Sequence, residues 1–119
     1  MTGHFELKRG ADGRFLFNLK AGNGEIILTS GVFASKGAAS TGIEAVKANA
    51  PNDKLYERKI ATNKKPYFIL KSADGAVLGR SEMYSSTTTM ENGIKSVMRN
   101  AVEAPVRDLA PRIASMAAR

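Results

Sequence analysis

The chain of 119 residues contains no cysteine, no tryptophan and a single histidine. Without cysteine it can form neither a disulfide nor a thiolate metal site, and its eleven acidic residues are scattered singly, so no metal site is expected. Apolar residues nowhere run for the roughly 18 positions that a membrane span requires. The charged segment 1–9 does not resemble a secretory signal. We therefore expect a cytoplasmic protein with no metal, no cofactor and no contact with a membrane.

The residue types needed for catalysis are equally scarce. The one histidine, His4, has no cysteine to activate and is expected to be exposed and without a structural role. Serine and threonine are plentiful in 85–89, but no base stands nearby to activate a hydroxyl group. The glycines match neither of the phosphate-binding loop patterns. These absences predict a protein that is not an enzyme, with no catalytic, cofactor-binding or metal-binding residues.

What the chain does contain is a duplication. When residues 4–50 are placed on 55–101 without a gap, thirteen of the 47 pairs are identical, whereas unrelated sequences would share about three. Each copy has about 50 residues, near the lower limit for an independent core without disulfides or metals. We therefore expect the two copies to complete one shared core. The shared pairs include Phe17/Phe68, Leu19/Leu70, Gly24/Gly75, Ser30/Ser81, Gly42/Gly93, Ile43/Ile94, Val46/Val97 and Asn49/Asn100.

Each copy begins with the alternation of apolar and polar residues that is typical of half-buried strands. Phe17 and Leu19 are apolar in the first copy, and Phe68 and Leu70 repeat them in the second. The strands are separated by turn-forming pairs, namely Asp12-Gly13, Asn23-Gly24 and Asp74-Gly75. The last two predict type I′ turns, in which both central residues adopt positive φ. Each copy is therefore predicted to open with a three-stranded antiparallel meander.

The apolar period then changes to that of a helix. Ser35 and Ser86 are the shared candidates for the helix N-cap, while Thr88 and Glu91 form an alternative capping box in the second copy. Glycine inside a helix costs about 1 kcal/mol relative to alanine, so the shared pair Gly42/Gly93 predicts a close approach of each helix to the sheet. The helical faces are formed by Ala39, Ile43, Val46 and Ala50 and by Met90, Ile94, Val97 and Ala101.

We predict one domain over residues 1–108, with a first repeat at 4–50, a second at 55–101 and a closing strand at 102–108. The remaining segment, 109–119, is predicted to be a short helix or disordered. The expected core consists of Phe17, Leu19, Ile26, Ile43, Val46, Phe68, Leu70, Val77, Ile94 and Val97.

Longer motifs identify a family. Segment 19–26 reads LKAGNGEI and 42–50 reads GIEAVKANA, similar patterns recur as LKSADG at 70–75 and GIKSVMRNA at 93–101, and 104–108 reads APVRD. Together they resemble the YegP-like family of small bacterial proteins. The resemblance implies an α+β fold made of a duplicated β3-α-β unit. Its single antiparallel sheet carries both helices on one face and exchanges the strands that follow the helices. The resemblance implies no activity, because the family has none established.

The charge balance suggests one functional alternative. Eighteen basic and eleven acidic residues give a net charge of +7, which favours electrostatic attraction to nucleic acids. The basic residues gather around the hairpin at 54–65, beside two tyrosines that could stack on bases. Lysines also protect exposed strand edges from aggregation, which is the competing explanation. The predicted contacts for weak, sequence-tolerant nucleic-acid binding are Lys54, Arg58, Lys59, Lys64, Lys65, Tyr56 and Tyr67.

Two further interpretations stay open at this stage. The shared polar pairs Ser30/Ser81, Ser35/Ser86 and Asn49/Asn100 could form two symmetric small-ligand or peptide sites, or could satisfy backbone groups at strand and helix ends. Exposed sheet edges could pair with a protein partner or, in a homodimer, with a second copy of the chain. The sequence assigns no function; it best fits a small non-enzymatic binding or structural module, with nucleic-acid binding as the alternative.

Overall fold

Seven strands from both copies form one sheet in the computed structural model, which describes residues 3–110. The order of strands is β4-β5-β6-β3-β2-β1-β7, so each copy contributes a meander and the two meanders meet at β3 and β6. The elements are β1 (His4–Arg9), β2 (Phe15–Lys20), β3 (Ile26–Thr29), α1 (Lys36–Asn49), the 3₁₀ helix η1 (Asp53–Leu55), β4 (Tyr56–Ile60), β5 (Pro66–Lys71), β6 (Val77–Arg80), α2 (Thr87–Ala101) and β7 (Val106–Asp108).

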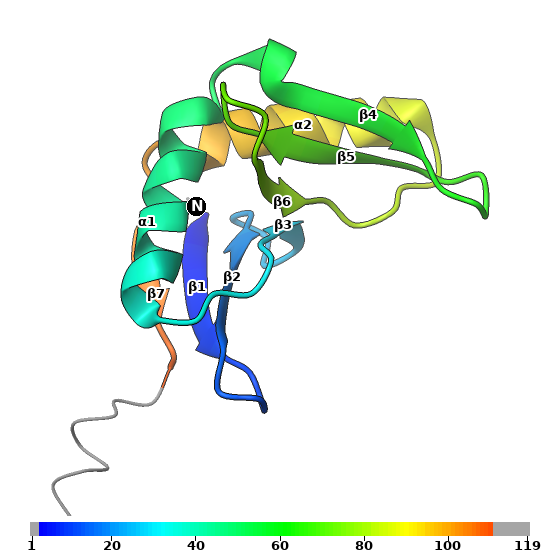
Figure 1. Cartoon of the computed structure of the whole chain (residues 1–119). Helices are drawn as coiled ribbons and strands as arrows, with labels where there is room; N and C mark the ends of the chain where they lie inside the picture. Colours follow the sequence, from blue (N-terminus) through cyan, green and yellow to red (C-terminus); the bar gives the residue numbers. More distant parts are fainter. Residues whose placement is uncertain (1–2, 111–119) are drawn as a thin grey trace, which may run out of the picture.

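The helices cross the seam between the two meanders. α1 contacts β1 and β2 of its own copy and also β6, while α2 contacts β5 of its own copy and also β1 and β3 (Figure 1). The sheet itself is narrow at this seam, where β3 and β6 share a single antiparallel pair, Thr29 with Arg80. The helices therefore hold the halves together at least as much as the sheet does. This duplicated α+β arrangement is the one that the sequence predicts.

The end of the sheet differs from the expectation. β7 follows α2 of the second copy but pairs with β1 of the first, so one strand is exchanged, and this pair is parallel rather than antiparallel. The Phe5 N–H donates to the Pro105 carbonyl at 2.8 Å. No equivalent strand follows α1, because the residues after that helix form η1 and must begin β4 at once. A tandem chain thus leaves room for one exchanged strand only.

The four hairpin turns share one geometry, which is not type I′. Positive φ occurs at one residue of each turn, at Gly13, Gly24, Lys64 and Gly75, with values of 83°, 88°, 69° and 92°. Neither Asn23 nor Asp74 has positive φ. Instead the Asn23 side chain accepts the Glu25 N–H at 3.0 Å, and the sheet register shifts at Leu19/Lys20. This bulged turn satisfies the loop backbone with a side chain, which favours it over the tighter turn.

Both helices begin where the shared serines predict. The Ser35 side chain accepts the Ala38 N–H at 3.0 Å, and Ser86 accepts the Thr89 N–H at 3.2 Å. In the second copy the Thr89 hydroxyl also accepts the Ser86 N–H at 3.2 Å. The capping box therefore joins Ser86 and Thr89 rather than Thr88 and Glu91. These caps satisfy backbone donors that would otherwise lack partners at a helix start.

Aromatic rings explain the two helical glycines. Phe17 stacks on Phe33 with centroids 5.9 Å apart, and Phe68 stacks on Tyr84 at 6.2 Å. A Cβ atom on Gly42 would lie 2.8 Å from Phe33 Cζ, and one on Gly93 would lie 2.6 Å from Tyr84 Cζ. Each glycine therefore admits a ring from the loop before its helix, and it is this ring as well as the sheet that approaches the helix closely.

The core departs from the prediction in β3 and β6. Val77 is 61% exposed and Ile26 is half-buried, whereas Leu28 is fully buried. A bulge inside each strand follows these residues, so Ile26 and Val77 pair with Lys20 and Lys71 on the outer face. Leu28 and its repeat mate, Gly79, pair with the inward-facing Leu19 and Leu70. The other eight predicted core residues are fully or almost fully buried, namely Phe17, Leu19, Ile43, Val46, Phe68, Leu70, Ile94 and Val97.

Leu28 and Gly79 occupy equivalent positions on neighbouring strands, but only one carries a side chain. A Cβ atom on Gly79 would lie 2.8 Å from Leu28 Cγ. The leucine therefore fills the seam from the first copy and leaves no room for a side chain on the second. The core at the seam is packed asymmetrically although the backbone is repeated.

Candidate functional site

The tyrosines of the predicted nucleic-acid hairpin do not form an exposed stacking surface. Tyr56 is 4% exposed, and its hydroxyl donates to the Ala50 carbonyl at 2.8 Å. Burial raises the pKa of this hydroxyl above its ordinary value, and the charge of Asp53 adds to the effect. Tyr67 is half-buried on the opposite face, where the Arg80 guanidinium lies 5.7 Å from its ring. Tyr56 is a core residue and cannot stack on a base.

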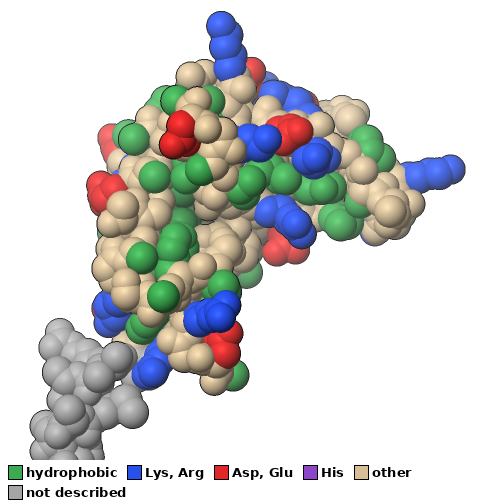
Figure 2. All heavy atoms as spheres, viewed as in Figure 1, with side chains coloured by type: hydrophobic (Ala, Val, Ile, Leu, Met, Phe, Trp, Pro, Cys, Tyr) green, Lys and Arg blue, Asp and Glu red, His purple; other side chains and the backbone are tan. Residues whose placement is uncertain are grey.

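The basic residues of this hairpin are also divided. Arg58 binds Glu91 through two hydrogen bonds of 2.6 and 3.0 Å and reaches Asp53 at 3.0 Å. Lys59 lies 3.6 Å from Glu57. Lys54, Lys64 and Lys65 are exposed residues of η1 and the β4–β5 turn. On the face shown in Figure 2, Lys and Arg side chains alternate with Asp and Glu rather than gathering into one patch. Nothing in this arrangement supports nucleic-acid binding.

The shared polar pairs serve the backbone in both copies. Ser30 accepts the Phe17 N–H and donates to the Gly31 carbonyl, at 2.9 and 2.7 Å, and Ser81 repeats both bonds with Phe68 and Glu82 at the same distances. Asn49 and Asn100 each donate to the carbonyl four residues earlier, at 2.8 Å. With the two helix caps, these contacts account for all three pairs. They hold the fold and form no symmetric ligand sites.

A repeated charge cluster lies on the sheet face away from the helices. Glu6 contacts Lys20 at 3.1 Å and Lys8 at 3.6 Å, and Glu57 makes the same pairs with Lys71 and Lys59. In the first copy the His4 ring adds a hydrogen bond of 2.9 Å to Glu6. This bond, assisted by Lys20, holds the pKa of Glu6 at about 2. His4 is thus a partly buried structural residue, contrary to the expectation that it is exposed and without a role.

The sheet edges differ in how their backbone groups are satisfied. On the first copy the Phe5 N–H pairs with the strand β7. On the second, the N–H of Tyr56 instead donates to the Asp53 carbonyl, and the Arg58 side chain donates to the Tyr56 carbonyl at 3.3 Å. The start of β4 is therefore closed by its own turn and side chain. A partner or second copy that pairs at the remaining edges stays a prediction.

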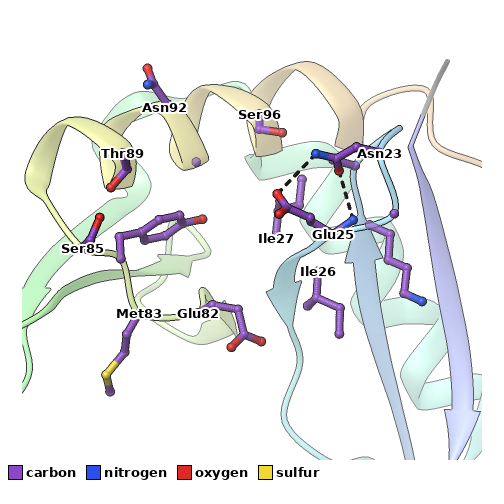
Figure 3. A pocket seen from close by; sticks show the side chains of 15 residues that line it. Asn23, Glu25, Ile26, Ile27, Glu82, Met83, Ser85, Thr89, Asn92 and Ser96 are labelled. Carbon is purple, nitrogen blue, oxygen red and sulfur yellow. Dashed lines mark hydrogen bonds between the residues drawn. The ribbon is translucent and has the colours of Figure 1, made fainter.

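A large hollow lies at the seam between the copies. We call it the seam groove. It has a volume of about 840 Å³ and is open to solvent. Its walls are the β2–β3 hairpin of the first copy and, from the second copy, the loop 82–85 and the exposed side of α2 (Figure 3). The lining residues with polar side chains are Lys20, Asn23, Glu25, Glu82, Tyr84, Ser85, Thr89, Asn92 and Ser96.

Several polar groups of the seam groove make no hydrogen bond within residues 3–110. These are the hydroxyls of Tyr84 and Ser85 and the carboxylate of Glu82, while Glu25 receives one bond of 3.3 Å, from Asn23. Figure 3 shows Glu82 and Glu25 on opposite sides of the opening, whereas the Asn92 amide turns outward. Burial raises the pKa of the Tyr84 hydroxyl, and the charges of Glu25 and Glu82 raise it further. Tyr84 is therefore a neutral hydrogen-bond donor at neutral pH.

Most of the polar positions of the seam groove have no polar counterpart in the other copy. Six of its polar positions have repeat mates with an apolar or absent side chain. These mates are Ala76 for Glu25, Gly31 for Glu82, Phe33 for Tyr84, Ala34 for Ser85, Ala38 for Thr89 and Ala45 for Ser96. By contrast, the serines and asparagines that support the fold are kept in both copies. The two halves share their scaffold and differ in the lining of this groove.

The seam groove could not be predicted from the residues that the two copies share. Shared residues mark what both copies need, which is the fold. The signal that could have found the groove is the opposite one, a run of mates in which only one copy is polar. Ser85, Thr89 and Ser96 against alanines in the first copy are such a run. That they converge with Glu25, from the other copy, required the structure.

Neither a metal cluster nor a membrane helix is present in the part of the chain that the structure describes. Among residues 3–110, no three His, Cys, Asp or Glu side chains lie close enough to hold a metal ion. In the same range, neither α1 nor α2 has the length and apolar character needed to cross a bilayer.

Comparison with known proteins agrees with this architecture. The family model described as "Domain of unknown function (DUF1508)" matches twice, at residues 11–57 and 61–108. The UPF0339 protein YegP of Yersinia pestis is 49% identical over 107 residues, which are 90% of this chain and 96% of that protein. A UPF0339 protein of Shewanella oneidensis is 48% identical over 109 residues, 92% of this chain and 99% of its own.

Two solved structures have the same fold. The solution NMR structure of yegP from E. coli, a protein of unknown function, superposes with a TM-score of 0.88 at 45% identity, covering 94% of this chain and 97% of its own. That of a UPF0339 protein from Shewanella oneidensis gives 0.87 at 47% identity, covering 92% and 93%. The two matched repeats, the sequence identity and the shared fold agree, and the chain belongs to the YegP-like UPF0339 family of duplicated DUF1508 domains, whose function is unassigned.

Proposed function

We propose that this protein is a non-enzymatic binding module whose ligand occupies the seam groove. The observation that carries the proposal is the one-sided polarity of this groove. Glu25, Tyr84 and Ser96 have mates that are alanine, phenylalanine and alanine, although the scaffold around them is repeated. Fold maintenance does not require these polar groups, because the equivalent positions of the other copy fold the same way without them. A ligand is the simplest reason for their presence.

The size and polarity of the groove support a small or extended ligand. Ligand sites in proteins have volumes of roughly 300–1,000 Å³ and place a few polar groups among apolar ones. The seam groove falls in this range at about 840 Å³, and Ile26, Ile27 and Met83 supply apolar surface beside its polar groups. Its openness to solvent favours a ligand that lies along the surface over one that is enclosed.

Binding is a better explanation than catalysis for the groups in this groove. Its titratable residues are Lys20, Glu25, Glu82 and Tyr84. Lys20 is engaged by Glu6 at 3.1 Å, and Tyr84 is held in its neutral form, so no activated base or nucleophile stands among them. We therefore propose that the protein carries out no reaction. The cytoplasmic location expected from the sequence also stays a prediction.

A fragment titration tests the proposed function. The ¹⁵N-labelled protein is mixed with small polar compounds of cationic, neutral and anionic character, and backbone shifts are recorded. We expect shifts at 20–27 and 82–96, and none at the repeat mates in 31–45 and 71–78. Ser96→Trp, which fills the groove, should abolish the response, and Ala45→Trp at the equivalent helix position should not. Shifts that are absent, or equal in both halves, would contradict the proposal.

A further inference from the structure

The charge of the seam groove is opposite to that of the molecule. The chain has a net charge of +7, yet the groove contains the carboxylates of Glu25 and Glu82 and a single cation, Lys20. The ammonium of Lys20 lies 3.1 Å from Glu6, which also pairs with Lys8 and so offsets part of its charge. A ligand in the groove thus meets net negative charge on a molecule that is positive overall.

The negative charge is placed where a positive group could be surrounded. Glu25 extends from the β2–β3 hairpin and Glu82 from the loop before α2, so the two carboxylates approach from different copies (Figure 3). Both lie close enough to the Tyr84 hydroxyl to act on it electrostatically. A protonated amine between them would receive charge-assisted hydrogen bonds from oxygen acceptors on both sides.

We propose that the seam groove binds a protonated amine, presented by a small polyamine or by a lysine side chain of a peptide. This inference rests on the proposed function and names its ligand class. The hydroxyls of Tyr84, Ser85 and Ser96 offer further acceptors for the ammonium hydrogens, and Ile26 and Met83 offer apolar surface for the methylene chain. Carboxylate and phosphate ligands are excluded by repulsion from the same two glutamates.

The equivalent place in the other half is a built-in control. There Glu25 is replaced by Ala76 and Glu82 by Gly31, and Phe33 has no hydroxyl. The one carboxylate at an equivalent position is that of Asp74, the mate of Asn23. An amine that is attracted only by general electrostatics would have no reason to choose one half. Selective binding at 82–96 over 31–45 would therefore report the proposed site.

The experiment measures amine binding by calorimetry and by ¹⁵N shifts in the full-length chain. The probes are 1,4-diaminobutane and a blocked Gly-Lys-Gly peptide, with succinate as the anionic control. We expect both amines to change the ¹⁵N shifts of residues 20–27 and 82–96. Succinate should change the shifts of neither segment. The amine that binds more tightly shows whether the groove prefers a small polyamine or a lysine side chain. The affinity should fall as NaCl is raised from about 50 to 300 mM, because partly exposed charges are screened.

Two variants test the carboxylates directly. Glu25→Gln combined with Glu82→Gln should weaken amine binding about tenfold, since neutral amides lose the charge attraction but keep the shape. Glu44→Gln changes an exposed glutamate of α1 away from the groove and should leave binding unchanged. Equal binding by the double variant, or equal binding of succinate, would overturn the proposal. Neutral fragments that bind in the groove when amines do not would reject this inference and leave the proposed function standing, and no binding at all would reject both.

Discussion

The first and second copies of this protein share a backbone but contribute differently to the packing of the seam and to the lining of the seam groove. The first copy supplies Leu28, which fills the seam, where the second has Gly79. The second copy supplies the polar wall of α2, where the first has alanines. Thirteen identical pairs therefore identify the scaffold, and the positions that differ identify what each half does alone. Duplication within one chain permits this, because each copy can lose what the other provides.

The largest expected effect concerns the leucine and glycine at the seam. Leu28→Gly removes a fully buried side chain and should lower the free energy of unfolding by about 3–5 kcal/mol. Gly79→Leu should lower it by about 1–3 kcal/mol through overpacking. The double exchange should recover about 2 kcal/mol or more of the summed loss, because the leucine then fills the seam from the other copy. Urea denaturation measures all three.

The same series has a clear negative outcome. If the losses of the two single variants simply add in the double variant, Leu28 and Gly79 do not share one space. The asymmetric packing of the seam would then be wrong. Leu7→Ala, in the separate buried cluster with Phe15 and Ala39, lies away from this pair and is the control that should add to either single change.

A smaller effect on stability is expected, and it differs between the central glutamates of the two charge clusters. The Glu6 side chain is 12% exposed and that of Glu57 is 42% exposed. The pKa of Glu6 is lowered to about 2 from 4.5. At 1.36 kcal/mol per pKa unit, reduced for solvent screening, Glu6→Gln should cost about 1–3 kcal/mol at pH 7. Glu57→Gln should leave the unfolding midpoint unchanged.

The pH dependence of Glu6→Gln follows from the direction of the shift. Because the carboxyl has a lower pKa in the folded chain than in the unfolded one, the unfolded chain takes up the proton first. The stabilisation from Glu6 is therefore complete above about pH 5 and is lost as the pH falls towards about 2. Thermal unfolding from pH 7 to pH 2 should bring the wild type and Glu6→Gln together. A constant difference down to pH 2 would show that Glu6 acts through packing rather than charge.

The smallest expected effect compares the hairpin turns. Lys64 holds a φ of 69°, where the other three turns have glycine. A residue with a Cβ atom is strained in this region, so Lys64→Gly should raise the free energy of unfolding by about 0.5–1 kcal/mol. Gly75→Lys, at the equivalent point of the β5–β6 turn, should lower it by about 1 kcal/mol. Thermal denaturation checks both, and a loss of stability in Lys64→Gly would contradict the strain.

Local signals in the sequence predicted where the helices and strands lie, but they predicted less well which strand residues face the core. Ser35 and Ser86 marked the helix starts, and Gly24 and Gly75 marked the hairpins, because caps and positive φ are local demands. Ile26 was predicted to face the core, but Leu28 does so instead, because a bulge between these two residues shifts the alternation by one position. A bulge depends on how two strands pair, which a single strand's pattern does not contain.

The candidate site was beyond local signals for a related reason. The predicted hairpin was chosen from charges that lie close in the sequence, and the structure shows Arg58 bound to Glu91 and Tyr56 buried in the core. The seam groove instead joins Glu25 to Tyr84 and Ser96, which are about half the chain apart. The pairing of β3 with β6 and the packing of α2 against β3 bring these segments together. No sequence pattern within one copy predicts that these residues lie together.

The unequal seam also has a consequence for exchanging the copies. A chain built from two first copies would bring two leucines into the space that Leu28 already fills, and one built from two second copies would leave that space empty around two glycines. Neither copy retains a surface that matches itself. The two copies are therefore not interchangeable, and neither can be replaced by a second copy of the other without disturbing the seam.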